Sequence, residues 1–340
     1  MSQFDIHQIL EQLYAAKSLS SEQSQAFFEQ VVQGQVDPII LSSVITALKM
    51  KGETPQEIAG AANALLAQAA PFPRPDYAFT DIVGTGGDGL GTINISTASA
   101  FVAAACGVKV CKHGSRSVSS KSGSSDLLAA FGVNLNMSAE VARQCLDELN
   151  VCFIFAPQYH AGMRFAAPVR AALKTRSIFN LLGPLVNPAR PEFELMGVYA
   201  PELLKPIAEV HKQLGMKRVM VVYGSGLDEV ALHGETQVAE LNNGEITEYS
   251  LTPEDFGVQR YPVEAIFGGN PSENKIIIEK ILQGTGSEAQ QAAVAINVSA
   301  LLVLNGKADN FKDGTKQALE IMQTGKPLQL LKALAERSQC

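Results

Sequence analysis

From residue 79 onward the sequence alternates short apolar runs with longer amphipathic segments, and this alternation limits the fold more than any other feature. Such a pattern predicts a sheet flanked by helices, because a sheet must bury its apolar faces against other elements. We therefore predict an α/β fold for this part of the chain. The expected strands are Phe79–Val83, Val108–Cys111, Val151–Phe155, Leu195–Tyr199 and Arg218–Tyr223.

Glycine marks the ends of the helices expected between these strands. Gly107, Gly132 and Gly215 each stand where a helix would need a left-handed cap. Glycine and other small residues also follow the carboxyl ends of the expected strands. Open α/β sheets bind their ligands at that edge, so we expect the functional site there.

The first 70 residues have helical periodicity and almost no strand signal. This segment ends at Pro71–Pro75, where the fixed dihedral angles of proline suit a linker. Residues after about 270 are again helical, and we expect them to pack on the sheet without forming a third domain. The helical periodicity of the first 70 residues rests on Leu10, Leu13 and Tyr14 on one face, and on Ile58, Ala62, Leu65 and Leu66 on another.

Composition excludes several classes of protein. The chain has 340 residues, of which 46% are hydrophobic, so two domains are favoured over one. Charges of both signs sum to -7, which argues against a nucleic-acid partner. No secretory signal or apolar membrane-spanning stretch is evident, and five scattered cysteines argue against a disulfide framework or thiolate zinc site. We expect a cytoplasmic protein without a membrane partner.

A glycine loop, residues 84–92, lies between the first expected strand and its helix. It belongs to the string DIVGTGGDGLGT, which NIST follows after one residue. Backbone N–H groups in such a loop can turn inward and bind a polyphosphate beside a helix N-terminus. A merely flexible turn is the alternative, but the strand, the helix and the polar residues favour phosphate binding. The loop matches neither the P-loop nor the dinucleotide pattern.

A second loop, residues 112–126, follows the next expected strand. It contains Lys112, His113, Arg116 and Lys121 together with seven serines. These side chains supply charge and short donors to phosphate oxygens. A solvated linker is the alternative, but the loop lies between two apolar core segments, where a linker is out of place.

The strings DIVGTGGDG, NISTA, KHGSRSVSSKSGSSDLL, APVR, RSIFNLLGPLVNPA and GLDE occur in this order over nearly the full chain. Through them the sequence resembles the anthranilate phosphoribosyltransferase family. The resemblance implies a small all-helical domain, residues 1–72, completed by helices from about 163–188. A larger α/β domain, residues 73–340, would contain a central, mostly parallel sheet flanked by helices. The family also implies a homodimer formed through the helical domain, with the active site between domains.

The resemblance also implies two substrates, phosphoribosyl pyrophosphate (PRPP) and anthranilate, and a magnesium cofactor with two ions per subunit. Lys112, Asp228, Glu229 and Arg170 would be the catalytic residues. Ser96, Asp228 and Glu229 would bind the metal, since hard oxygen ligands suit magnesium. The positions implied for PRPP are Gly84, Thr85, Gly86, Gly87, Asp88, Thr92, Asn94, Ser96, Thr97, Lys112 and Ser124.

Anthranilate needs a cation for its carboxylate and flat apolar walls for its ring. The positions that the resemblance implies are Gly84, His113, Ser115, His160 and Arg170. The family usually has asparagine where this chain has Ser115. A serine hydroxyl is shorter, so the contact could be lost, bridged by water or made by Asn180. Without the resemblance, His160 would be interpreted as an ordinary helix-start residue, Arg170 as an exposed helix charge and the acidic pair as a solvated surface turn.

Two other functions share the predicted architecture. A pyrimidine nucleoside phosphorylase has a similar glycine loop, but it is normally longer and lacks the FNLLGPLVNPA string. A nucleic-acid-binding relative needs a basic face, whereas this chain has a pI near 5.4 and retains Asp228 and Glu229.

Overall fold

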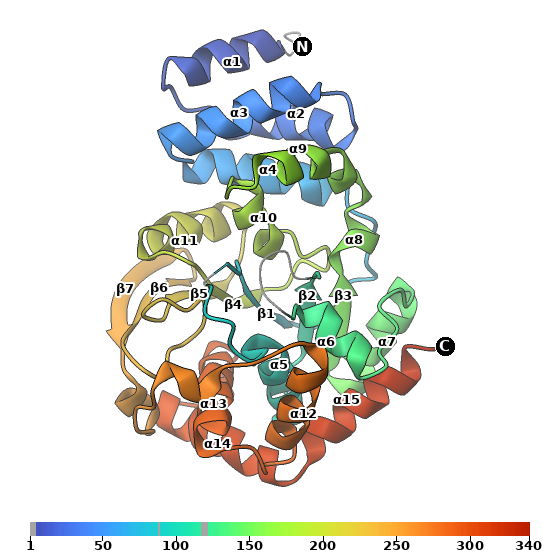
Figure 1. Ribbon diagram of the computed structural model, residues 1–340, viewed down its shortest axis with the longest axis vertical. Coiled ribbons are helices and arrows are strands. Elements are labelled where there is room, and N and C mark those ends of the chain that lie inside the picture. Colours follow the sequence, from blue (N-terminus) through green and yellow to red (C-terminus); the bar gives the residue numbers. More distant parts are fainter. Residues whose placement is uncertain (1–4, 88, 117–121) are drawn as a thin grey trace.

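The computed structural model describes residues 5–87, 89–116 and 122–340. Four helices form a bundle at one end of the molecule, and a sheet with helices on both faces makes up the rest (Figure 1). The bundle helices are α1 (Ile6–Tyr14), α2 (Ser21–Val32), α3 (Pro38–Lys51) and α4 (Pro55–Ala67). The strands are β1 (Thr80–Gly84), β2 (Val110–Gly114), β3 (Val151–Phe155), β4 (Phe193–Gly197), β5 (Arg218–Tyr223), β6 (Thr236–Asn242) and β7 (Glu245–Leu251). The remaining α-helices are α5 (Ile95–Ala105), α6 (Ser124–Ala130), α7 (Ala139–Leu149), α8 (Ala156–Tyr159), α9 (Ala167–Leu173), α10 (Phe179–Leu185), α11 (Leu204–Gln213), α12 (Pro271–Leu282), α13 (Glu288–Leu304), α14 (Phe311–Gln323) and α15 (Lys326–Arg337).

The seven strands form one sheet in the order β3-β2-β1-β4-β5-β6-β7. The five strands β3, β2, β1, β4 and β5 pair in parallel in this order, whereas β6 pairs antiparallel with both β5 and β7. The prediction of a mostly parallel sheet flanked by helices is confirmed. The five expected strands are present with ends shifted by up to three residues. Five parallel strands share one carboxyl edge, which is the edge where we expected the site.

Glycine caps three helices as predicted. Gly107, Gly132 and Gly215 follow α5, α6 and α11 with φ of 88°, 89° and 80°. A residue with a Cβ would be strained in this conformation.

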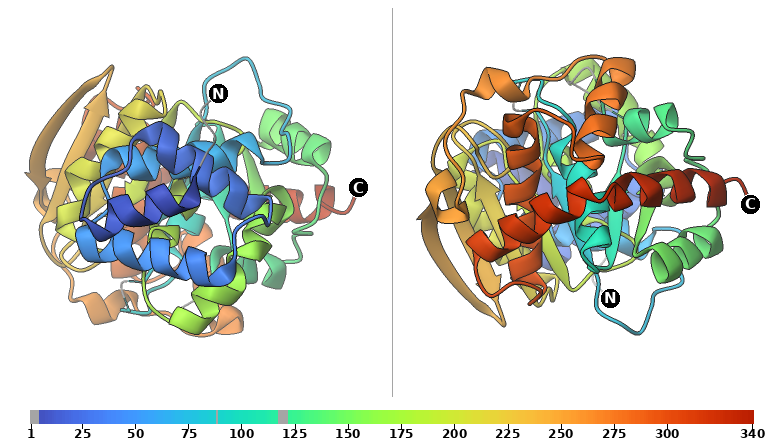
Figure 2. Two further views of the ribbon diagram at one scale, coloured as in Figure 1. Left: turned by 90° about the horizontal axis from the view of Figure 1, so that it is seen from above. Right: turned by 90° about the horizontal axis from the view of Figure 1, so that it is seen from below.

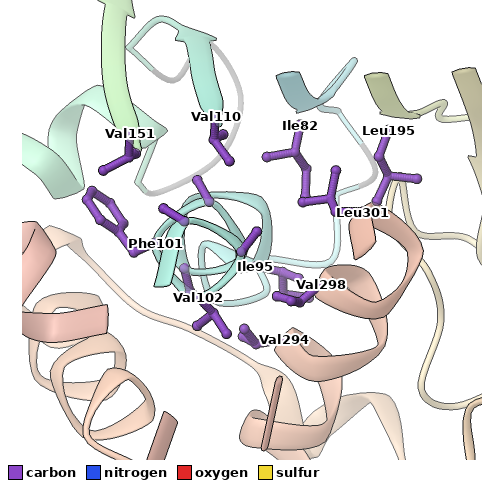
Figure 3. Packing of buried hydrophobic residues seen from close by; sticks show 14 of the residues in the cluster. Ile82, Ile95, Phe101, Val102, Val110, Val151, Leu195, Val294, Val298 and Leu301 are labelled. Atoms are coloured by element: carbon purple, nitrogen blue, oxygen red, sulfur yellow. The ribbon is translucent and has the colours of Figure 1, made fainter. Parts of the chain in front are cut away.

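Helix α5 fills the space between the sheet and α13. Ten of its eleven residues are buried, so it is apolar on all sides. Figure 3 shows Ile95, Phe101 and Val102 of α5 surrounded by side chains from both elements. Burial of each large apolar side chain contributes about 1.5–3 kcal/mol, so this packing fixes the helix and the glycine loop that leads into it. The labelled neighbours are Ile82, Val110, Val151 and Leu195 of the strands and Val294, Val298 and Leu301 of α13.

The opposite face of the sheet packs against α10 and α11, which lie between it and the bundle (Figure 1). Residues of the bundle, of these two helices and of this face belong to one apolar core. Phe179 of α10 contacts Phe28 of α2 with ring centroids 5.7 Å apart. Helices α12–α15 lie on the α5 side, at the far end from the bundle (Figure 2, right).

Tyr14 departs from the predicted helical pattern. Leu10 and Leu13 are buried, but Tyr14 is 60% exposed. Within the part of the chain that the structure describes, no helix is long and apolar enough to span a membrane.

Candidate active site

The glycine loop begins at the carboxyl end of β1 and leads into α5, as predicted. Its backbone is held at both ends, because the Thr85 N–H donates to the Gly197 carbonyl at 3.0 Å and the Gly91 carbonyl accepts from Gly268 N–H at 2.9 Å. Asp88, predicted to bind PRPP, lies outside the described residues. Positive φ values occur at Gly86, Gly87, Gly89 and Gly91.

Two carboxylates from the segment after β5 meet this loop and the start of α5. The Gly86 N–H donates to Asp228 Oδ2 at 2.6 Å. Ser96 donates to Glu229 Oε1 through its N–H at 3.1 Å and also through its hydroxyl. The fold therefore joins the three predicted metal ligands, although more than 130 residues separate Ser96 from Glu229 in the sequence.

Three glycines leave room for the acidic pair. An ideal Cβ on Gly84 would lie 2.2 Å from Asp228 Oδ2, and one on Gly224 would lie 2.2 Å from the Glu229 carbonyl. The closest approach is at Gly197, whose ideal Cβ would lie 1.6 Å from the Asp228 carbonyl oxygen. Real Cβ atoms almost never come within 3.0 Å of such neighbours. The strand ends must therefore be glycine for the acidic pair to lie where it does.

The buried amide of Asn297 on α13 fixes the backbone immediately after the pair. It accepts from Val230 N–H at 3.0 Å and donates to the Val230 carbonyl at 3.3 Å. Sequence reasoning did not find Asn297, because a lone asparagine inside an apolar helix carries no motif.

Lys112 is buried in the middle of β2 beside these acids. Its ammonium donates to the Ile82 carbonyl at 2.6 Å. Burial lowers the pKa of Lys112, while the neighbouring Asp81, Glu229 and Asp228 favour its charged form. Lys112 is thus a buried amine surrounded by acidic side chains, not a surface charge.

Asp81 is a second buried acid that the sequence analysis did not select. Its carboxylate accepts from Asn187 Nδ2 at 2.8 Å and from the N–H groups of Ile82 and His113. Burial raises its pKa to about 6, although Lys112 opposes that change. Asp81 and Asn187 both occurred within strings that carried the family resemblance, but their roles were not apparent.

The acidic pair offers oxygen ligands to a cation. Burial, together with the adjacent Asp228, raises the pKa of Glu229 to about 8. The described residues contain no cluster of three or more histidines, cysteines or carboxylates that could hold a metal alone. Magnesium, which often binds one or two carboxylates together with substrate phosphates, fits this pair and the Ser96 hydroxyl.

The other predicted donor residues surround the start of α5. Asn94 accepts from Asn274 Nδ2 at 2.9 Å and donates to the Ser122 carbonyl at 3.0 Å, which links the glycine loop to the second loop. Thr92 pairs with Phe267 in an isolated bridge, and Thr97 is buried. Ser124 begins α6, and its hydroxyl donates to the Ser115 carbonyl at 3.4 Å.

The predicted acceptor residues form two groups. His113 and His160 are buried and contact each other edge to face, with ring centroids 5.5 Å apart. Burial, reinforced by the neighbouring His160, lowers the pKa of His113 to about 3. Burial also lowers the pKa of His160. Both rings are therefore neutral near pH 7. Arg170 lies on α9 with its guanidinium carbon 5.5 Å from the centre of the Phe179 ring.

Comparison with known proteins identifies the family. The chain matches the family models described as "Glycosyl transferase family, a/b domain" over residues 76–328 and "Glycosyl transferase family, helical bundle domain" over residues 7–69. It is 88% identical over 340 residues to an anthranilate phosphoribosyltransferase of Psychromonas ingrahamii, covering 100% of both chains. The chain belongs to the anthranilate phosphoribosyltransferase family. The family's counterpart in Vibrio cholerae is 62% identical over 329 residues, which are 97% of this chain and 99% of the relative.

Solved structures of anthranilate phosphoribosyltransferases have the same fold. The enzyme of Thermus thermophilus is 39% identical with a TM-score of 0.93, covering 98% of this chain and 99% of that one. The Saccharomyces cerevisiae enzyme in complex with PRPP and Mg is 27% identical with a TM-score of 0.90, covering 98% of both. A further structure of the yeast enzyme contains 4-fluoroanthranilate.

Ser115 stands where the resemblance leads us to expect asparagine. It is exposed, and its carbonyl accepts from Ser124. Asn180, the suggested substitute, already accepts from Ser177 N–H at 3.0 Å through its amide oxygen. A new contact from Asn180 would therefore use its amide nitrogen or share this oxygen with Ser177.

A cavity of about 370 Å³ lies next to the amino ends of β4 and β5. None of the residues predicted for either anthranilate phosphoribosyltransferase substrate lines it. Its lining includes Arg74, Arg190, Glu194, His211 and Lys217.

Proposed function

We propose that this protein transfers the phosphoribosyl group of PRPP to the amine of anthranilate, giving N-(5-phosphoribosyl)anthranilate and pyrophosphate. This is the second step of tryptophan biosynthesis from chorismate. The observation that carries the proposal is the meeting of Asp228 and Glu229 with the glycine loop and Ser96. A metal-complexed diphosphate supplies both the anion that the loop can bind and the cation that the acids need.

On the donor side, the pyrophosphate would bind the inward N–H groups of the glycine loop, with Thr85, Thr92, Asn94, Thr97 and Ser124 as further donors. The Thr85 hydroxyl supports this assignment, because it is buried without a hydrogen-bond partner among residues 5–87, 89–116 and 122–340. Such an orphaned group costs about 1–3 kcal/mol unless a ligand or water satisfies it.

Two magnesium ions per subunit would be held by Ser96, Asp228, Glu229 and the substrate phosphates. Bound there, magnesium would offset the negative charge that builds on the leaving pyrophosphate. The observed carboxylate pair fits this role, because Glu229 is half-buried beside Asp228 and already accepts from the Ser96 N–H.

On the acceptor side, Arg170 would bind the anthranilate carboxylate, and Gly84, His113, Ser115 and His160 would line the ring and its approach. The rings of His113 and His160 suit this task because they are buried and neutral. His113 Nε2 has no partner in the described part of the chain, which leaves it available to a ligand.

The reaction needs no strong base at its start, because the aromatic amine is neutral and has a free lone pair. Its nitrogen forms a bond to the anomeric carbon of the ribose while the bond from that carbon to pyrophosphate oxygen breaks. The nitrogen then loses one proton. Lys112 and the N–H groups of the glycine loop stabilise the departing anion, and preorganised donors of this kind commonly contribute several kcal/mol. Closure of the domains around both substrates would exclude water, which could otherwise hydrolyse the donor.

The predicted domains are a helical unit, residues 1–72 with helices from about 163–188, and an α/β unit, residues 73–340. Burial of Val169 and Phe179 in the same core as the bundle supports the contribution of α9 and α10. The matched family ranges fall on either side of the predicted boundary. A cytoplasmic location stays a prediction from the sequence.

A homodimer through the helical domain is part of the proposal. Tyr14 on α1 is 60% exposed, and Ile39 and Met50 on α3 are 77% and 84% exposed. Large apolar side chains gathered on one bundle suit an interface between copies. Ile39→Lys combined with Met50→Lys should shift the sedimentation coefficient to that of a monomer. Ile276→Lys on α12, at the far end of the molecule, is the control and should leave it unchanged.

Anthranilate fluorescence tests the function directly. The signal should fall only when PRPP and magnesium are both present, and pyrophosphate should appear in equal amount. Phosphate-dependent cleavage of a pyrimidine nucleoside would favour the nucleoside phosphorylase instead. A gel shift of nucleic acid without anthranilate consumption would favour a nucleic-acid-binding protein.

A further inference from the structure

A short segment between α9 and α10 joins the two sides of the active site. Lys49 of α3 holds its backbone from the bundle side, since its ammonium donates to Thr175 Oγ1 at 2.5 Å and to the Arg176 carbonyl at 2.6 Å. The Ser177 N–H donates to Asn180 Oδ1 at 3.0 Å at the start of α10. The backbone of Arg176 is thus fixed by the helical part of the molecule.

The side chain of Arg176 crosses to the glycine loop. One of its terminal nitrogens donates to the Gly87 carbonyl. The guanidinium carbon lies 4.0 Å from the centre of the Tyr199 ring, which follows β4. Stacking on an aromatic face fixes the plane of a guanidinium and leaves its edges free to donate. An ideal Cβ on Gly87 would come within 3.2 Å of this group, so glycine also permits the close approach.

The other anchors of the loop come from the α/β part. Thr85 is held by Gly197, Gly86 by Asp228, and Gly91 by Gly268. The contact from Arg176 differs because it begins on the segment that Lys49 fixes to the bundle. Arg170, the predicted acceptor residue, lies six positions earlier, on α9.

We propose that Arg176 is a positioning residue that ties the glycine loop to the helical side and so prepares it for PRPP. The inference rests on the proposed function, because it assigns the loop to pyrophosphate. Arg176 acts through the Gly87 carbonyl: restraining that peptide restrains the neighbouring N–H groups, which then lose less freedom when they bind the anion. The helix that precedes this segment, α9, carries the predicted acceptor residue Arg170, so Arg176 links the two substrate sites.

Calorimetric titration with PRPP and magnesium tests the proposal without depending on turnover. Arg176→Ala should raise the Kd for PRPP about fivefold, which is about 1 kcal/mol at 1.4 kcal/mol per tenfold. The KM for PRPP should rise by the same factor, while the KM for anthranilate stays within twofold. Hydrogen exchange of the peptide that covers residues 84–92 should be faster in the variant without ligand.

Neighbouring variants separate positioning from direct phosphate binding. Lys49→Met should weaken PRPP binding in the same direction, because it releases the backbone of Arg176. Tyr199→Leu removes the ring and should do likewise. Tyr199→Phe keeps the ring and is the matched control, with binding within twofold of the wild type. Thermal unfolding should show all four variants to be folded.

Three outcomes would overturn the inference. One is an unchanged Kd in folded Arg176→Ala. Another is weaker binding in Arg176→Ala with no change in either Lys49→Met or loop exchange, since this would make Arg176 a direct phosphate ligand. The third is that Tyr199→Phe weakens PRPP binding as much as Tyr199→Leu does. Failure of the wild-type protein to bind PRPP would instead refute the proposed function.

Discussion

Gly197→Ala tests the close packing beneath the acidic pair. The added Cβ would lie 1.6 Å from the Asp228 carbonyl oxygen, and the separation must grow to at least 3.0 Å. The backbone of Asp228 must therefore move by about 1.4 Å, or β4 must shift by as much. Because a misplacement of about 1 Å near reacting groups can cost about 100-fold in rate, we expect kcat/KM to fall by at least about 100-fold.

Measurement combines anthranilate fluorescence with calorimetric binding of PRPP and magnesium. Gly224→Ala provides a graded comparison, since its Cβ needs a shift of only about 0.8 Å, from 2.2 to 3.0 Å, and should cause a smaller loss. Gly183→Ala is the matched control for PRPP binding, because its Cβ would meet nothing within 4 Å. Overpacking typically destabilises a fold by about 1–3 kcal/mol, so circular dichroism must first establish that each variant is folded. A folded Gly197→Ala protein with kcat/KM within threefold of the wild type would refute the reasoning.

Four side chains give further predictions. Arg170→Ala should chiefly raise the KM for anthranilate in steady-state kinetics, and an unchanged KM would refute the assignment of Arg170 to the acceptor. Lys112→Ala should instead lower kcat through the loss of a donor-side contact. Thr85→Val should weaken PRPP binding but raise the free energy of unfolding by about 1 kcal/mol, because it removes a buried hydroxyl that has no partner among the described residues. Burial lowers the pKa of His211 to about 3, so the unfolded chain binds its proton more readily and stability falls as the pH drops from about 6.5 toward 3. His211→Met should flatten that fall by up to about 1.4 kcal/mol per pH unit in urea unfolding, and an unchanged slope would contradict it.

The parallel strands and the glycine caps of the helices between them were predictable because their signals are local. An apolar run of about five residues favours a buried strand, and a glycine at the end of an amphipathic segment favours a helix cap. The hairpin of β6 and β7 was missed, although Asn243 and Gly244 have φ of 49° and 88° and an Asn-Gly pair is a known hairpin signal. β7 is polar and largely exposed, so it lacks the apolar run by which the other strands were recognised.

The acidic pair was predicted through the family strings, but what supports it was not. Gly197 and Asn297 lie on β4 and α13, far from Asp228 in the sequence, and only the folded chain brings them together. Asp81 and Arg176 were likewise within quoted strings, yet their roles depend on burial and on a contact across the site. Long-range contacts of this kind leave no periodic pattern in one sequence.

The most direct test of the account is a calorimetric titration of the wild-type protein with PRPP, in magnesium and again after chelation with EDTA. We predict binding with magnesium, its loss on chelation, and its loss when Asp228→Ala and Glu229→Ala are combined. Equal affinity for PRPP in all three conditions would contradict the claim that the glycine loop and the acidic pair together bind a metal-complexed diphosphate.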